Sequence, residues 1–216
     1  MKPFEETTLS QHPEVKAAYA FLKKYVDQGM VDFDDQVLKI AETVSALYPN
    51  DPALIAAAVA LPVQMAAVYN EDAALNRRIE AALPVQAVDY MIAYAYGTHP
   101  AGVEKFPRIP LEARQGAFTL IAAGILTDMK EMEQFAKTAA PEQLQEIRAR
   151  YSAFSLEDSE DPIMPSLQDY ADMAGLTVQN APVLAEIVKL AEKLGGKETP
   201  PAAKPRNKRG GNGPRP

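Results

Sequence analysis

The sequence predicts an all-helical protein, and three of its features support this fold class. Alanine supplies much of the 47% apolar content, and alanine favours both helix formation and close helix packing. Many of the 18 prolines stand where a helix would begin, a position at which the missing N–H of proline costs little. Apolar residues recur at the three- and four-residue spacing of amphipathic helices. The expected architecture is therefore a multi-helix bundle with no sheet.

The helix boundaries follow from prolines, acidic caps and glycines. We expect helices over residues 13–28, 34–47, 52–69, 72–82, 84–97, 111–137, 141–153, 167–174 and 181–194. The segment 52–69 is apolar on nearly every face, which predicts a central, buried helix that Pro62 should kink. Three prolines between Gly97 and Pro110 predict an irregular loop there.

Charge divides the chain into a body and a tail. We expect an N-terminal lead over 1–12, one helical domain over 13–195 and a disordered basic tail over 196–216. The net charge is −7, but residues 197–216 carry +5, which leaves −12 on the rest of the chain. Such a body should repel nucleic acid, whereas the tail could contact it weakly and without sequence preference. The residues for that contact are Lys204, Arg206, Lys208, Arg209 and Arg215. A solubilising tail without a partner is the alternative.

Several classes of protein are excluded or disfavoured by composition. The chain has no cysteine, which excludes disulfides, zinc–thiolate sites, iron–sulfur clusters and thiol nucleophiles. The N-terminal residues contain no apolar signal-like segment. The longest apolar run, Ala53 to Met65, is interrupted by Pro62 and Gln64. We therefore expect a cytoplasmic protein that does not contact a membrane.

No local motif assigns a catalytic residue, a metal or a cofactor. The sequence has neither a Gly-x-Ser-x-Gly elbow nor a phosphate-binding Gly-x-x-x-x-Gly-Lys loop. His12 and His99 are expected at the surface, because neither has another ligand-type residue at helical spacing. The carboxylates are expected mainly as helix caps and solvated faces. Five basic residues either contact an anion or form ion pairs within the acidic body: Arg77, Arg78, Lys105, Arg108 and Arg114.

Five segments occur in an order and spacing typical of one known family. They cover residues 36–41 (QVLKIA), 54–63 (LIAAAVALPV), 79–95, 123–130 (AGILTDMK) and 141–151 (PEQLQEIRARY). In this order the chain, over about residues 14–152, resembles the HD-domain phosphohydrolases. The specific resemblance is to the hydrolase domain of the RelA/SpoT-type (p)ppGpp enzymes. It implies an HD-like helical core.

The resemblance also implies that the metal site of that family is missing. The positions that hold a divalent metal in the family correspond to Gln36, Pro62, Val63 and Gly124, none of which is a good metal ligand. We expect these four residues to lie together as a vestigial site, around a pocket closed by apolar packing. Without the ion there is no activated water to attack a pyrophosphate bond.

Three functions follow from these observations. The leading one is a non-catalytic HD-like binding or regulatory domain, with no cofactor, whose ligand is a nucleotide or an unknown protein partner. The second is a small (p)ppGpp or nucleotide phosphohydrolase with an atypical site, in which Asp34, Asp35 and Asp128 would be the first residues to test. The third is a helical structural protein whose tail contacts nucleic acid.

Overall fold

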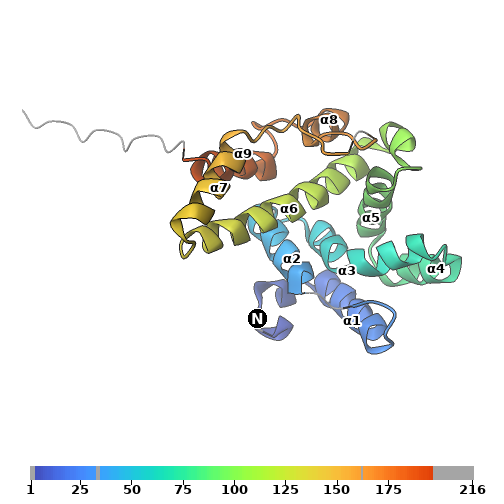
Figure 1. Cartoon of the computed structure of the whole chain (residues 1–216). Coiled ribbons are helices and arrows are strands. Elements are labelled where there is room, and N and C mark those ends of the chain that lie inside the picture. Colours follow the sequence, from blue (N-terminus) through green and yellow to red (C-terminus); the bar gives the residue numbers. More distant parts are fainter. Residues whose placement is uncertain (1–2, 33–34, 162, 197–216) are drawn as a thin grey trace, which may run out of the picture.

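The structure, a computed structural model, describes residues 3–32, 35–161 and 163–196. Over these ranges the protein is all-helical, with nine α-helices, three short 3-10 helices and no strand (Figure 1). The predicted fold class is confirmed. The helices are η1 (Phe4–Glu6), η2 (Thr8–Gln11), α1 (Pro13–Asp27), α2 (Asp35–Leu47), α3 (Pro52–Tyr69), α4 (Ala73–Ala82), α5 (Val85–Thr98), η3 (Val103–Arg108), α6 (Leu111–Ala136), α7 (Pro141–Ser152), α8 (Leu167–Met173) and α9 (Pro182–Leu194).

Proline and acidic caps set the helix starts, as the sequence predicts. Proline is the first residue of α1, α3, α7 and α9, where its fixed φ suits the first turn. The Asp51 carboxylate accepts a hydrogen bond from the N–H of Leu54 at the start of α3. At the start of α4, the Asp72 carboxylate accepts from the N–H groups of Ala74 and Leu75. These caps satisfy N–H groups that have no partner within the helix.

Helix α3 lies at the centre of the N-terminal half, packed between α1, α2 and α5 (Figure 1). All eight residues from Ala53 to Ala60 are buried, which confirms the central position predicted for this segment. Alanine at five of the eight allows the neighbouring helices to approach closely. By length and mean hydropathy (1.7) this helix could cross a membrane, but 61% of it is buried inside the protein. Packing against other helices accounts for its composition.

Two hydrophobic cores meet along the long helix α6. The first core joins α1 to α5 with Leu120 and Ala123 of α6. The second joins α6 to α9 with Ala93 of α5 and Phe106 of η3. Figure 1 shows α6 running between these two groups of helices. Because α6 contributes to both cores, it connects the two halves of the described chain.

Two expectations are refined by the structure. The loop predicted between α5 and α6 contains η3, which places Phe106 in the second core, fully buried. The lead over 1–12 contains η1 and η2, and its Phe4 and Leu9 are buried against the first core. The predicted tail contacts, Lys204 to Arg215, lie outside the described residues.

Candidate functional site

The four residues of the predicted vestigial site have different surroundings in the structure. The Nε2 of Gln36, at the start of α2, donates a hydrogen bond of 2.8 Å to an Asp128 carboxylate oxygen on α6. Val63 is fully buried in the first core, and Pro62 is partly buried beside it. A Cβ at Gly124 would meet no atom within 4 Å, so no apolar packing closes over that position. The proximity of Pro62 and Val63 to Gly124 stays a prediction.

The structure describes two of the three carboxylates predicted for an atypical hydrolase site. Asp35 is exposed in the first turn of α2, and Asp128 accepts the hydrogen bond from Gln36. Asp34 lies outside the described residues. Across the described ranges, no group of three or more His, Cys, Asp or Glu side chains has the arrangement needed to hold a metal ion.

A polar cleft of about 650 Å³ lies between α2 and α6, close to this predicted site. We call it the α2–α6 cleft; it is lined by Lys39, Glu42, Thr43, Thr127, Lys130, Glu131, Glu133 and Gln134. Three of its five charged residues form ion pairs, with Lys39 2.6 Å from Glu131 and Glu133 2.6 Å from Lys193 of α9. The buried hydroxyl of Thr127 donates to the carbonyl of Ala123 at 2.7 Å. Most polar groups of this cleft thus have partners within the protein.

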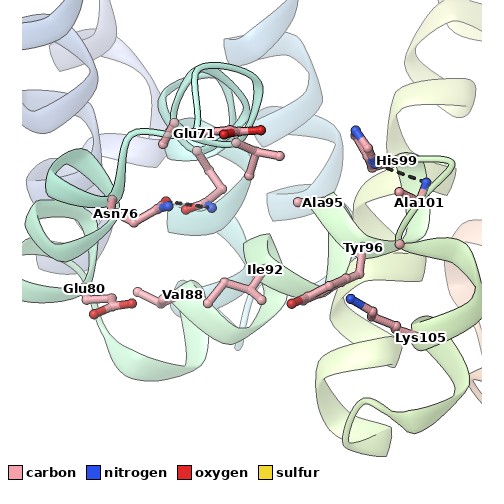
Figure 2. A pocket seen from close by; sticks show the side chains of 15 residues that line it. Glu71, Asn76, Glu80, Val88, Ile92, Ala95, Tyr96, His99, Ala101 and Lys105 are labelled. Atoms are coloured by element: carbon pink, nitrogen blue, oxygen red, sulfur yellow. Dashed lines mark hydrogen bonds between the residues drawn. The ribbon is translucent and has the colours of Figure 1, made fainter.

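A second cavity, of about 520 Å³, lies between the C-terminal half of α3, α4, α5 and η3. We call it the Gln64 pocket. Its lining residues are Gln64, Ala67, Val68, Glu71, Ala73, Asn76, Glu80, Val88, Ile92, Ala95, Tyr96, His99, Ala101, Gly102 and Lys105. Figure 2 shows Asn76 and Glu80 on one side, Tyr96, His99 and Lys105 on the other, and Val88 and Ile92 between them. A cavity of this size with apolar walls and a few polar groups is typical of small-molecule sites.

Gln64 is the distinctive residue of this pocket. It is the only amide, hydroxyl or charged side chain between Pro52 and Val68, and it is 4% exposed. Its Nε2 donates a hydrogen bond of 3.3 Å to Oδ1 of Asn76 on α4 (Figure 2). Among the described residues, no group donates to Oε1 of Gln64. The fully buried unpaired atoms of the described residues are the Tyr25 hydroxyl and Nε of Arg114, so the Gln64 oxygen is instead reached from the cavity, where it can accept a hydrogen bond from a ligand.

Glu71, at the rim of the pocket, has an unfavourable backbone conformation. It follows the C-cap of α3 with φ +51°, in the left-handed region that glycine usually occupies at this position. The N–H of Glu71 donates to the carbonyl of Val68, and the N–H of Asp72 donates to that of Ala67, which closes the end of the helix. A non-glycine residue in this region costs about 1 kcal/mol or more. The backbone conformation that places the Glu71 carboxylate at the rim therefore lowers the local stability.

The opposite wall is formed by the end of α5 and the turn into η3. The Lys105 ammonium lies 5.9 Å from the centre of the Tyr96 ring. The Nδ1 of His99 accepts a hydrogen bond of 3.2 Å from the N–H of Ala101. A Cβ at Gly102 would lie 2.6 Å from the carbonyl oxygen of Tyr96, so only glycine lets the chain turn back this closely over α5.

A third cavity, of about 320 Å³, lies where the first turns of α3, α5 and α6 meet. Its central group is the hydroxyl of Tyr90, which Gln86 contacts with Nε2 at 2.5 Å and which lies 3.4 Å from the Asp51 carboxylate. Burial, together with the charge of Asp51, raises the pKa of Tyr90 to about 12. The acidic residues here face helix N-termini, which accounts for them without a ligand.

The basic residues considered for anion binding do not converge. Arg114 donates from Nη1 to the carbonyl of Met173, at the end of α8. Arg78 lies 4.0 Å from Asp72 and 5.8 Å from the centre of the Tyr25 ring. Lys105 lies over Tyr96 on the other side of the Gln64 pocket. Arg114 and Arg78 thus interact with residues at helix ends, and of the five only Lys105 lines the Gln64 pocket.

Sequence reasoning missed Gln64, Glu71 and Asn76. The signal for Gln64 was present, because it is the one strongly polar side chain in an otherwise apolar helix. The sequence does not show that Asn76 lies opposite it, or that Glu71 has a positive φ.

The chain has no significant match among protein-family models, curated proteins or solved structures. The resemblance to the RelA/SpoT-type hydrolase domain stays a prediction. The function is therefore argued from the geometry of the sites.

Proposed function

We propose that this chain is a non-catalytic helical binding module and that its ligand occupies the Gln64 pocket. The observation that carries the proposal is the amide of Gln64, which is 4% exposed and lines a cavity of about 520 Å³. A polar group in such a place can accept a hydrogen bond from a molecule bound in the cavity, and the apolar walls strengthen that bond.

The lining of the pocket supports binding over chemistry. Its described side chains include no serine, threonine or cysteine, the usual nucleophiles of covalent catalysis. Seven of the fifteen lining residues are alanine, valine or isoleucine, which exclude water and contact the apolar part of a ligand. Polar contacts are left to Gln64, Asn76 and the residues at the rim. A pocket with apolar walls and a few polar groups is suited to binding a specific small molecule.

The degenerate HD-like core remains part of the proposal. It rests on the order of the five segments and on the residue types at Gln36, Pro62, Val63 and Gly124. The hydrogen bond between Gln36 and Asp128 joins two helices that the resemblance brings together. We expect purified protein with manganese or magnesium to leave guanosine tetraphosphate and ordinary nucleotides intact. Turnover that a chelator abolishes would replace this proposal with the hydrolase function.

Occupancy of the pocket is tested with N-phenyl-1-naphthylamine, an uncharged dye that fluoresces in apolar surroundings. Ala73 is exposed and lines the pocket, whereas its neighbour Ala74 is exposed and does not. We expect the dye to bind saturably to the unchanged protein and to Ala74→Phe. The Ala73→Phe variant should bind about tenfold more weakly or worse, because its ring fills the cavity. Equal binding by the two variants would disprove the pocket as the site.

A further inference from the structure

Gln64 and Asn76 together present one hydrogen-bond acceptor and one donor to a ligand in the Gln64 pocket. One N–H of Gln64 Nε2 donates to Oδ1 of Asn76, with the two atoms 3.3 Å apart. This contact leaves Oε1 of Gln64 as an acceptor and Nδ2 of Asn76 as a donor, and neither has a partner among the described residues. A ligand that offers both an N–H and a carbonyl satisfies the two groups at once.

The walls of the pocket favour a flat, weakly polar body next to that edge. Val88, Ile92 and Ala95 of α5 form one wall, and the ring of Tyr96 continues it (Figure 2). An aromatic ring beside aliphatic side chains suits a planar heterocycle, which stacks or packs edge-on with little loss of conformational freedom. A sugar ring placed against these walls would need more hydrogen-bonding partners than they provide, so the ribose of a nucleoside would have to lie outside them, toward the polar rim.

The charges around the pocket disfavour an anionic ligand. Glu71 and Glu80 on one side face a single ammonium, Lys105, on the other (Figure 2). The residues outside 197–216 carry a net charge of −12, which adds to the negative potential. A phosphorylated compound would enter against this potential, whereas an uncharged one would not.

We propose that the pocket binds an uncharged planar heterocycle with a lactam edge, of the kind found in free nucleobases and nucleosides, and that it rejects the phosphorylated forms. The Oε1 of Gln64 accepts from the lactam N–H, and the Nδ2 of Asn76 donates to the lactam carbonyl. This inference rests on the proposed function, because it assumes that the Gln64 pocket is the binding site.

Three related probes test the inference by calorimetry on the full chain. Inosine carries the lactam N–H and carbonyl, 1-methylinosine lacks that N–H, and inosine 5′-monophosphate adds negative charge. We expect inosine to bind, and both other compounds to bind about tenfold more weakly or worse. Equal binding of inosine and 1-methylinosine would refute the role of Gln64. Equal or tighter binding of the monophosphate would refute the selection against charge.

Substitutions at Gln64 and Asn76 test whether inosine binds through these two amides. Gln64→Leu and Asn76→Ala should each weaken inosine binding about tenfold or more, whereas Gln36→Leu, in the predicted vestigial site, should leave it unchanged. Asn76 is partly exposed on α4, so its variant keeps the test valid where Gln64→Leu fails to fold. Inosine affinity that survives both amide changes would overturn the inference.

Failure of this inference differs from failure of the proposed function. If the naphthylamine dye binds and Ala73→Phe abolishes that binding, the pocket is a ligand site. Absence of inosine binding would then reject the lactam edge alone. If neither the dye nor inosine binds, both proposals are wrong.

Discussion

The Gln64 pocket and the α2–α6 cleft differ in how their polar groups are satisfied. The cleft is the larger, about 650 Å³ against 520 Å³, and it carries more charge. Its Lys39, Glu131 and Glu133 form ion pairs, and its buried Thr127 hydroxyl has a carbonyl partner. The pocket holds one buried amide whose oxygen has no partner among the described residues. The proposed function therefore rests on a buried amide that can still accept a hydrogen bond in the pocket, and not on the higher density of charged residues in the cleft.

The two regions also differ in their use of strain. Glu71, at the rim of the pocket, adopts a positive φ, whereas the other positive φ angles among the described residues belong to glycines. Strained residues concentrate at functional sites, where the surrounding structure holds them in place. The α2–α6 cleft lies between two regular helices and has no such residue. The following experiments extend this comparison, from the largest expected effect to the smallest.

Two glycines of α6 distinguish a packed from an open helix surface. A Cβ at Gly116 would lie 2.1 Å from the Tyr90 ring, whereas one at Gly124 would meet no atom within 4 Å. We expect Gly116→Ala to lower the free energy of unfolding by about 2–3 kcal/mol, because α5 must move away. Gly124→Ala should raise it by about 0.5–1 kcal/mol, since alanine is the better helix former. Urea denaturation measures both changes.

The same pair of variants tests the packing expected around the vestigial site. If Gly124→Ala is as destabilising as Gly116→Ala, then apolar side chains do close over Gly124. In that case the open surface described for the α2–α6 region is wrong.

Two buried polar residues test whether hydrogen bonds are satisfied in the two regions. Thr127, beside the cleft, is 3% exposed and donates to the Ala123 carbonyl, so Thr127→Val should cost about 1–1.5 kcal/mol. Gln64 is similarly buried, but its oxygen has no partner among the described residues. Gln64→Leu should therefore change stability by less than about 0.5 kcal/mol, because the gain of an apolar side chain offsets the lost bond to Asn76. Thermal and urea unfolding compare the two variants.

A large loss of stability in Gln64→Leu would contradict this prediction. It would mean that the amide serves the fold and not a ligand.

The strain at Glu71 is expected to have a smaller effect. Glu71→Gly should raise the free energy of unfolding by about 1 kcal/mol, because glycine adopts a positive φ without steric cost. Gly29, with φ +67° and open space around it, is the matched control. Gly29→Ala should lower stability by a similar amount. Unchanged stability in Glu71→Gly would show that Glu71 is not strained.

The sequence predicted the helices better than it predicted the site. Proline and acidic caps at residues such as Asp51 and Asp72 act locally, so their effect on helix starts is visible in the sequence. The apolar run of α3 likewise indicates burial without knowledge of its neighbours. The site depends on which helices meet, because Asn76 follows Gln64 by twelve residues and faces it only after α4 folds back. The segment 97–110 was expected to be irregular because of its prolines, but burial of Phe106 stabilises a short 3-10 helix there.

The smallest effect is expected at the ion pair between Glu133 and Lys193. The hydrogen bond from Lys193, 2.6 Å from the carboxylate, holds the pKa of Glu133 below its ordinary value. A lowered pKa stabilises the folded state above the ordinary pKa, and the stabilisation is lost as the pH falls through the lowered value. Lys193→Ala should therefore cost about 0.2–1 kcal/mol near pH 7 and less in acid, where the carboxyl is protonated in both states.

A difference of this size is measured as the pH dependence of unfolding for the unchanged protein, Lys193→Ala and Glu133→Gln. The two variants should share the same flattened dependence between about pH 3 and 5, because each removes one partner of the pair. Raising the salt concentration should reduce the difference, since the Lys193 side chain is 54% exposed. A cost for Lys193→Ala that is equal at neutral and acidic pH would assign the effect to the end of α9, where a lysine also interacts with the helix dipole. The α2–α6 cleft would then lack one of the charge pairs that distinguish it from the Gln64 pocket.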